Sequence, residues 1–229
     1  MTQRSIRVDL AAQVVVFDLD DTLCMERQFA VGGFAAAGNL MKQDYGISGF
    51  GDYCLNLLDA GFRGNIFNRA LAHFRVDDTS TLMNELISRY RSHSPDLTLM
   101  PDAVSFLNQL SGYKTALITD GPEVTQAAKV DALSLDQHID FIILTGQLPE
   151  GYSKPHPHAF EQVMEWSGLD ASLHVYIADN AGKDFLAPRR LGWKTVQIFR
   201  PGRMHNNDAP TPEHEADYRI ASFEEIGLI

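Results

Sequence analysis

An alternation of short apolar runs and helical patterns occupies the chain from about residue 98 onward. The apolar runs are rich in β-branched and aromatic residues and have the length of buried strands. They are Thr115–Ile118, Phe141–Leu144, Val175–Ala178 and Thr195–Phe199. Segments with apolar residues at helical spacing lie between and around them, at residues 102–110, 123–133, 158–166 and 183–191. This order predicts an α/β fold with a parallel sheet that is covered by helices on both faces.

The first apolar run, Val14–Phe17, ends in a cluster of aspartates, which is typical of a buried parallel strand whose carboxyl end opens into a site. The rhythm then breaks, because residues 26–93 hold no convincing strand and have the pattern of several helices. These residues therefore predict a helical insertion after the first strand. A loop rich in Pro and Asn at 201–212 precedes a last short strand at Tyr218–Ile220. The breaks between the inserted helices are 46–51, 61–64 and 76–79.

Composition narrows the class of protein. With 229 residues, of which 45% are hydrophobic, the chain is long enough to bury a core. Its 19 basic and 30 acidic side chains leave a net charge of -11, which would repel a phosphate backbone, so nucleic acid is excluded as a partner. Two cysteines favour a reducing compartment. No run approaches the roughly 18 apolar residues of a membrane span, so we expect a soluble, cytoplasmic protein without a membrane partner.

The sequence Asp18-Leu19-Asp20-Asp21-Thr22 follows the first strand and carries two carboxylates two residues apart. At a sheet-end loop, Asp18 and Asp20 can both point into one cleft. Such a pair can hold Mg²⁺, and one member can attack phosphorus while the other transfers protons. The alternative is a solvated turn with a threonine helix cap, and the strand-like run before it argues against that reading.

Three later strand ends carry chemistry of the same kind. Thr119-Asp120-Gly121 offers a hydroxyl and backbone N–H groups to phosphate oxygens. Lys154 precedes Pro155, which can begin a helix and so hold the ammonium near a site. Singly, each motif has an ordinary explanation as a turn or a surface residue, but four ordered matches on successive strand ends argue against coincidence. The fourth is the pair Asp179 and Asp184, acids five residues apart that suit metal ligation.

Together these motifs resemble the haloacid dehalogenase superfamily along nearly the whole chain. Two positions depart from the family pattern: Ala178 stands where glycine is frequent, and Asp120 stands where many relatives have asparagine. The resemblance implies a Rossmann-like α/β core formed by residues 1–25 and 95–229. It also implies a helical cap at residues 26–94, inserted after the first strand.

The resemblance implies a Mg²⁺-dependent phosphatase with an aspartyl-phosphate intermediate. In this scheme Asp18 attacks phosphorus, and Asp20 protonates the leaving alkoxide and then activates water. The metal ligands would be Asp18, the backbone carbonyl of Asp20, Asp179 and Asp184. Mg²⁺ would offset the repulsion between the anionic nucleophile and the phosphate. The carboxylate at Asp20 argues against dehalogenation, since a halide needs no acid to leave.

Phosphate binding would fall to the second and third motifs. By resemblance, Thr119 and Lys154 bind the non-transferred oxygens, where charge spreads in the transition state. Asp120 and Gly121 complete the phosphate loop, and the carboxylate of Asp120 adds charge near the phosphate.

The inserted helices resemble the family's mobile cap, which closes over the substrate and excludes water. Arg69 and His73 are the first candidates for contact with the leaving group. The alternative is that they are ordinary solvated helix residues. Further polar candidates in the same segment are Arg27, Arg63 and Asn65.

The substrate would be a small phosphorylated metabolite, such as a sugar, acidic-sugar or nucleoside phosphate, or phosphoglycolate. The segment from Gly121 through Gln126 and Lys129 to Lys154 resembles the branch with acylneuraminate phosphatases and pyrimidine nucleotidases. Two alternatives remain open: a phosphomutase on a sugar phosphate, which shares every motif, and a binding module that has lost catalysis. Because every expected catalytic side chain is present, the second is disfavoured. We expect a monomer or a homodimer.

Overall fold

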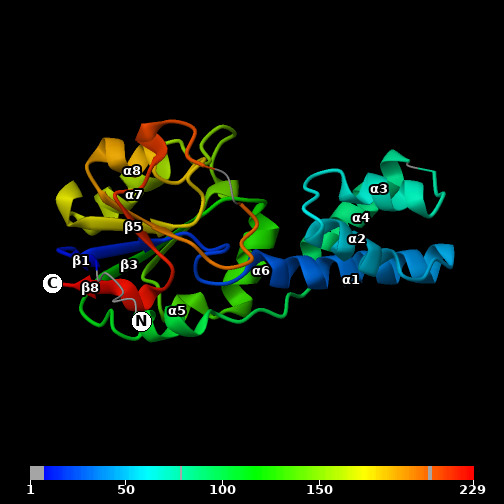
Figure 1. Cartoon of the computed structure of the whole chain (residues 1–229), viewed down its shortest axis with the longest axis horizontal. Coiled ribbons are helices and arrows are strands. Elements are labelled where there is room, and N and C mark those ends of the chain that lie inside the picture. Colours follow the sequence, from blue (N-terminus) through cyan, green and yellow to red (C-terminus); the bar gives the residue numbers. More distant parts are fainter. Residues whose placement is uncertain (1–7, 78, 206–207) are drawn as a thin grey trace, which may run out of the picture. The chain divides into compact units, whose positions relative to one another are not determined.

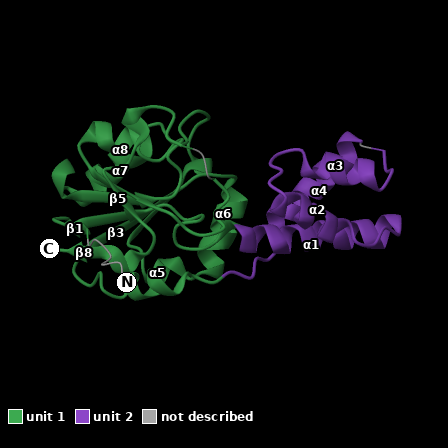
Figure 2. Ribbon diagram, in the orientation of Figure 1, with its two compact units in different colours: residues 1–26, 98–229 green, residues 27–97 purple. Residues whose placement is uncertain are grey.

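The chain forms two compact units in a computed structural model that describes residues 8–77, 79–205 and 208–229 (Figures 1 and 2). The core unit joins residues 1–26 and 98–229, and the helical unit spans residues 27–97. The core unit is therefore assembled from two separate stretches of the sequence. The helical unit is one continuous insertion.

A six-stranded sheet in the order β4-β3-β2-β5-β6-β7 forms the centre of the core unit, and every neighbouring pair is parallel. Each residue of β2 is buried, because this strand has a neighbour on both sides and helices on both faces. The parallel α/β sheet predicted from the alternating pattern is confirmed. The strands are β2 (Val14–Phe17), β3 (Lys114–Thr119), β4 (Phe141–Leu144), β5 (His174–Ala178), β6 (Lys194–Ile198) and β7 (Tyr218–Ile220).

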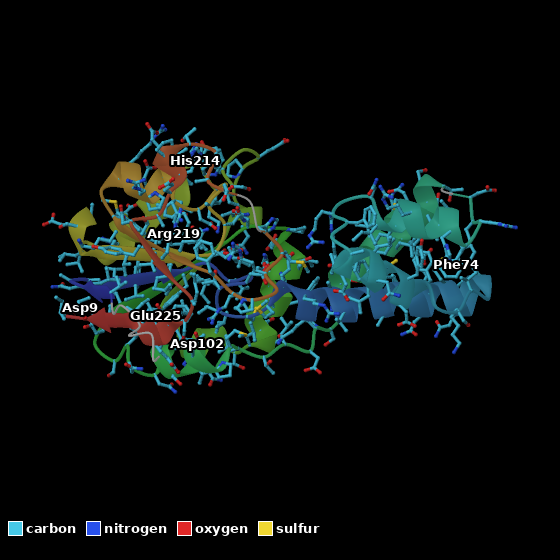
Figure 3. All side chains as sticks on the ribbon, viewed as in Figure 1. Asp9, Phe74, Asp102, His214, Arg219 and Glu225 are labelled. Atoms are coloured by element: carbon cyan, nitrogen blue, oxygen red, sulfur yellow. The ribbon has the colours of Figure 1, made fainter. Side chains whose placement is uncertain are left out.

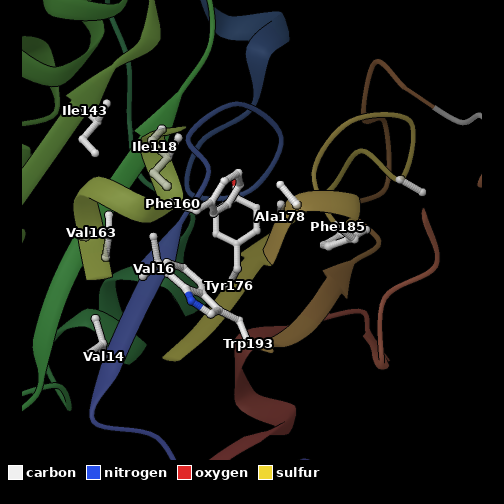
Figure 4. Packing of buried hydrophobic residues seen from close by; sticks show 14 residues of the cluster. Val14, Val16, Ile118, Ile143, Phe160, Val163, Tyr176, Ala178, Phe185 and Trp193 are labelled. Carbon is white, nitrogen blue, oxygen red and sulfur yellow. The ribbon is translucent and has the colours of Figure 1, made fainter. Parts of the chain in front are cut away.

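Helices α7 and α8 lie on one face of this sheet, and α5 lies on the other (Figure 1). On the α7 face, a cluster of buried residues includes Val16 from β2, Phe160 from α7 and Trp193 (Figure 4). On the α5 face, Phe17 packs edge-on against Phe106 and Phe223, with ring centroids 6.2 and 5.9 Å away. The helices are α5 (Pro101–Leu107), α6 (Glu123–Ala132), α7 (His158–Ser167) and α8 (Leu186–Leu191).

Three local features differ from the sequence prediction. A separate parallel pair, β1 (Val8–Leu10) and β8 (Ile226–Leu228), was not predicted, because three residues are too few to display a period. The expectation that Pro155 begins a helix is wrong, since α7 begins at His158. Likewise, α8 begins at Leu186, three residues after the predicted start of its pattern.

Four helices build the helical unit around an aromatic interior. The ring of Phe34 lies 5.8 Å from Phe67 and 5.1 Å from Tyr90 between ring centroids. Gly33 permits this packing, because a Cβ there would lie 2.5 Å from the Tyr90 ring. Across the described residues, every helix falls short of the length or apolar character that a membrane crossing requires. The helices are α1 (Glu26–Tyr45), α2 (Phe50–Asp59), α3 (Ile66–His73) and α4 (Ser80–Ser92).

The two points where the chain leaves and re-enters the core unit are bonded to each other. The N–H of Met100 donates to the carbonyl of Leu23 at 2.8 Å. Arg200, only 4% exposed, donates to the carbonyl of Thr22 at 2.9 Å through Nη2 and to Asp102 Oδ2 at 2.7 Å through Nη1. Asp102 lies on α5 (Figure 3). These bonds join the exit and return segments inside the core unit.

Candidate active site

The carboxyl ends of three adjacent strands bring the predicted motifs together. Because β2 pairs with β3 on one side and with β5 on the other, the residues that end or follow them lie at one edge of the sheet. Asp18 follows β2, Thr119 ends β3 and Asp179 follows β5. All three side chains are buried.

Lys154 places a buried positive charge beside Asp18 at this edge. Its Nζ lies 2.7 Å from Asp18 Oδ1 and 2.7 Å from Asp184 Oδ1, and it donates to the Tyr176 hydroxyl at 2.9 Å. Its side chain is 0% exposed, so the ammonium depends on these partners for stabilisation. Burial lowers the pKa of Lys154, but the carboxylates of Asp18 and Asp184 outweigh it and hold that pKa well above its usual value. Lys154 is therefore a fixed cation beside Asp18.

Asp18, Asp179 and Asp184 form a buried acidic cluster, each with a carboxylate oxygen within 4.8 Å of the others. Among the described residues, no group hydrogen-bonds Asp179 Oδ2. Burial, together with Asp18 and Asp184, raises the pKa of Asp179 to about 9. Burial also raises the pKa of Asp18 to about 6, although Lys154 opposes it. Crowded carboxylates with an unpartnered oxygen fit a hard divalent cation that prefers oxygen ligands.

Asp20, the second carboxylate of its motif, is held by two side chains of α6. Its Oδ1 lies 2.6 Å from Lys129 Nζ, and its Oδ2 accepts from Gln126 Nε2 at 3.0 Å. Burial raises the pKa of Asp20, but Lys129 and Gln126 outweigh it and hold the pKa below its usual value. Sequence analysis named Gln126 and Lys129 only within the resemblance to a family branch and did not assign them to Asp20. The signal was a lysine three residues after a glutamine on the helix that follows Gly121.

In the predicted phosphate loop, the hydroxyl of Thr119 and the carboxylate of Asp120 have different surroundings. Among the described residues, Thr119 Oγ1 is buried without a hydrogen-bond partner, which suits a hydroxyl that meets a ligand. The Asp120 carboxylate instead accepts from Thr145 Oγ1 at 2.8 Å and from Lys183 Nζ at 3.0 Å. It also accepts from the backbone N–H of Lys154 at 3.1 Å. The Asp120 side chain thus links the loop after β3 to the segments that carry Thr145, Lys154 and Lys183.

The backbone conformation at position 121 requires glycine. Its φ of +138° lies in the region that favours glycine, and a Cβ there would come within 3.0 Å of the Gln126 amide. Any side chain at this position would therefore displace Gln126.

The two leading candidates for contact with the leaving group have partners inside the helical unit. The Arg69 guanidinium lies 4.2 Å from the centre of the Phe62 ring, and its Nε donates to Asn65 Oδ1 at 3.2 Å. The His73 ring stacks on Tyr53 with centroids 4.0 Å apart. These contacts fix the two side chains, and their contact with a substrate stays a prediction.

Of the remaining candidates for contact with the leaving group, Arg27 forms a surface ion pair, whereas Arg63 and Asn65 line a cavity. Arg27 pairs with Asp59 at 2.7 Å, and both side chains are nearly half exposed. Arg63 donates to the carbonyl of Leu58 at 2.8 Å. Arg63 and Asn65 also line a cavity of about 330 Å³ in the helical unit, whose other walls are mostly apolar.

The core unit is thus a Rossmann-like α/β fold whose parallel sheet gathers an aspartate, a buried lysine and an acidic cluster at one edge. The model of the family described as haloacid dehalogenase-like hydrolase matches residues 15–198. The chain belongs to this family, which confirms the resemblance seen in the sequence.

Known proteins resemble the chain over nearly its whole length. A glyceraldehyde 3-phosphate phosphatase of Methanocaldococcus jannaschii is 27% identical, covering 93% of this chain and 94% of its own. A phosphoglycolate phosphatase of Pseudomonas fluorescens is 29% identical, covering 87% and 75%. A solved structure, a predicted phosphoglycolate phosphatase from Haemophilus somnus, has a TM-score of 0.68 at 20% identity, covering 93% and 96%. The chain is an enzyme of the same class, a phosphoric monoester hydrolase.

Proposed function

We propose that this enzyme is a Mg²⁺-dependent phosphatase that hydrolyses the phosphate ester of a small metabolite through an aspartyl phosphate on Asp18. The observation that carries the proposal is the buried Lys154 ammonium 2.7 Å from Asp18, beside an acidic cluster in which an oxygen of Asp179 has no hydrogen-bond partner within the part of the chain that the structure describes. A fixed cation beside a carboxylate offsets its negative charge and so favours the binding of an anionic substrate at this edge of the sheet.

In the first step, Asp18 attacks phosphorus in line. Asp20, which is protonated in the substrate complex because the phosphate dianion opposes the effect of Lys129, gives its proton to the ester oxygen as that oxygen leaves. Lys154 and the Thr119 hydroxyl bind the non-transferred oxygens, where negative charge spreads in the transition state. The backbone around Gly121 supports the same oxygens with N–H groups.

In the second step, water hydrolyses the aspartyl phosphate. Asp20 now accepts a proton from that water, which microscopic reversibility permits once the leaving group has departed. Inorganic phosphate is released and Asp18 returns as a carboxylate.

Mg²⁺ would be held by Asp18, Asp179 and Asp184, with the backbone carbonyl of Asp20 as a further ligand. When bound, the ion would offset the repulsion between the Asp18 carboxylate and the phosphate dianion. The donor set supports this assignment, since Mg²⁺ prefers carboxylate and carbonyl oxygens.

The names of the relatives support a small organic phosphate as the substrate, and the helical unit is the candidate for contacts with its leaving group. Curated relatives are named for glyceraldehyde 3-phosphate, phosphoglycolate and phosphoserine, which supports a small organic phosphate. Sugar, acidic-sugar and nucleoside phosphates belong to the same test set. The helical unit would act as the cap, supplying contacts to the leaving group that the sheet edge does not supply.

A panel of phosphorylated metabolites tests the proposal, with release of inorganic phosphate as the measurement. We expect release from one class of ester in the presence of Mg²⁺ and none in excess chelator. Asp18→Asn is the control against a contaminating phosphatase. Absence of release from every ester would refute the proposal, and isomerisation of a sugar phosphate without release would identify a phosphomutase instead.

A further inference from the structure

Both carboxylate oxygens of Asp20 are held by one helix. Lys129 Nζ lies 2.6 Å from Oδ1, and Gln126 Nε2 lies 3.0 Å from Oδ2. The two donors are three residues apart on α6 (Glu123–Ala132), so they project from the same side of the helix. The carboxylate is thereby fixed in both position and rotation. Each oxygen keeps a second lone pair for a substrate or a water.

The same helix also ties Asp20 to the phosphate loop. The Gln126 amide donates to the backbone carbonyl of Asp120 as well as to Asp20. Gly121 leaves the room that this amide occupies. One side chain thus sets the distance between the residue proposed to transfer protons and the loop proposed to bind phosphate.

A buried lysine is a costly way to hold a fold together. The Lys129 side chain is 3% exposed, and the Asp20 side chain is 19% exposed. Taking the two charges out of water offsets most of their attraction, and well-packed apolar residues serve stability at least as well. Glu26 lies close enough to add to the field around Lys129. What the ion pair supplies beyond packing is a defined carboxylate position, which proton transfer requires.

We propose that Lys129 and Gln126 are positioning residues that hold Asp20 in the orientation needed to protonate the leaving oxygen and then to activate water. They act through Asp20 and do not themselves touch the substrate. This inference rests on the proposed function, because it assigns the two residues to its proton-transfer steps.

A double-mutant cycle tests the inference with a readout that a merely structural role would not give. The variants are Lys129→Met, Asp20→Asn and the two combined, measured on an alkyl phosphate that the wild type hydrolyses. We expect Lys129→Met to lower kcat about 100-fold, at the low end of a proton-transfer contribution, with KM within about twofold. In the Asp20→Asn background the same change should alter kcat by less than about twofold, because the residue being positioned is already disabled.

Lys114→Met is the matched control. Lys114 is the first residue of β3, at the amino ends of the strands and so away from the candidate site. Its Nζ donates to the carbonyl of Ser167 at 2.8 Å. We expect its kcat to stay within about twofold of wild type. Should Lys129→Met fail to fold, Lys129→Gln, which keeps a neutral donor, is measured in its place.

Two outcomes would overturn the inference while the proposed function stands. One is a Lys129 variant with wild-type kcat, and the other is an equal loss of kcat with and without the Asp20 carboxylate. A wild type that releases phosphate from no ester would refute the proposed function and this inference together.

Discussion

The core unit and the helical unit solve the problem of a stable interior in opposite ways. Beneath the carboxyl edge of its sheet, the core unit buries ionisable groups, among them Asp18, Lys154 and Asp184. The interior described for the helical unit is instead apolar and aromatic, with Phe34, Phe67 and Tyr90 in mutual contact. Buried charge lowers stability unless it is paired, whereas aromatic packing raises it. We therefore expect the residues that carry out the reaction in the core unit, and residues that affect the choice of substrate in the helical unit.

The largest effect should come from the nucleophile. Asp18→Asn cannot form an acyl phosphate, so we expect turnover to fall by about 1,000-fold or more while the fold is kept. The measurements are phosphate release and thermal unfolding. Asp44→Asn, which changes an exposed acid on α1 of the helical unit, is the matched control and should leave turnover within about twofold. Residual activity above about a tenth of wild type would contradict the assignment of Asp18.

The second prediction concerns the acidic cluster of the core unit, through which Mg²⁺ and pH should change the stability of the protein. The pKa of Asp179 rises in the fold from 3.8 to about 9, so without a metal the folded state binds more protons than the unfolded state between these values. The Asp179 contribution to stability therefore declines as pH rises through this window. Mg²⁺ competes with that proton. Thermal unfolding should show a rise in Tm of about 5–10 °C at Mg²⁺ a hundredfold above its Kd.

At one fixed Mg²⁺ concentration, the rise in Tm should be larger at pH 9 than at pH 6, because Asp179 is about half ionised at pH 9 but carries at pH 6 the proton that the metal must displace. In Asp179→Asn we expect most of the rise to vanish and the metal-free protein to unfold at a higher temperature than wild type, since one of the crowded carboxylates is gone. Full activity in excess chelator, or an equal Mg²⁺ effect in Asp179→Asn, would contradict a cation at the acidic cluster.

The smallest effect should be on substrate choice. Lys154→Ala removes a charge that every phosphate ester meets, so all esters should slow together. Arg69→Ala and His73→Ala, in the helical unit, should instead change the ranking of kcat/KM among esters by about two- to tenfold. The measurement is kcat/KM for several esters in each variant. Unchanged rankings in both variants would make Arg69 and His73 packing residues of the helical unit, with Phe62 and Tyr53 as their partners.

The sequence predicted the sheet well because its signals are local. Val14–Phe17 and the later apolar runs have the length and composition of buried strands, and the structure has strands at each of them. The β1–β8 pair was missed, since two three-residue strands at opposite ends of the chain leave no local pattern. The side-chain role of Asp120 was also not predictable, because its partners Thr145 and Lys183 come from other loops.

The position of Asp20 shows the same limit at the candidate site. Its motif identifies the residue and the strand end, but not the direction of its carboxylate. That direction depends on Lys129, which lies 109 residues further along the chain. Pairings of this kind depend on how the strands and α6 pack together, which no local sequence pattern records.

The bonds that join the exit and return of the inserted segment have a consequence for how this enzyme diversifies. Leu23 and Met100 meet through one backbone bond, and Arg200 holds the carbonyl of Thr22 and the carboxylate of Asp102. The core unit therefore carries residues 27–97 as a loop with closed ends. Doubling the length of a flexible loop costs only about 0.6 kcal/mol. Evolution can thus exchange or enlarge the inserted module while the strand-end residues stay under their own selection, so that new specificities arise on an unchanged reaction centre.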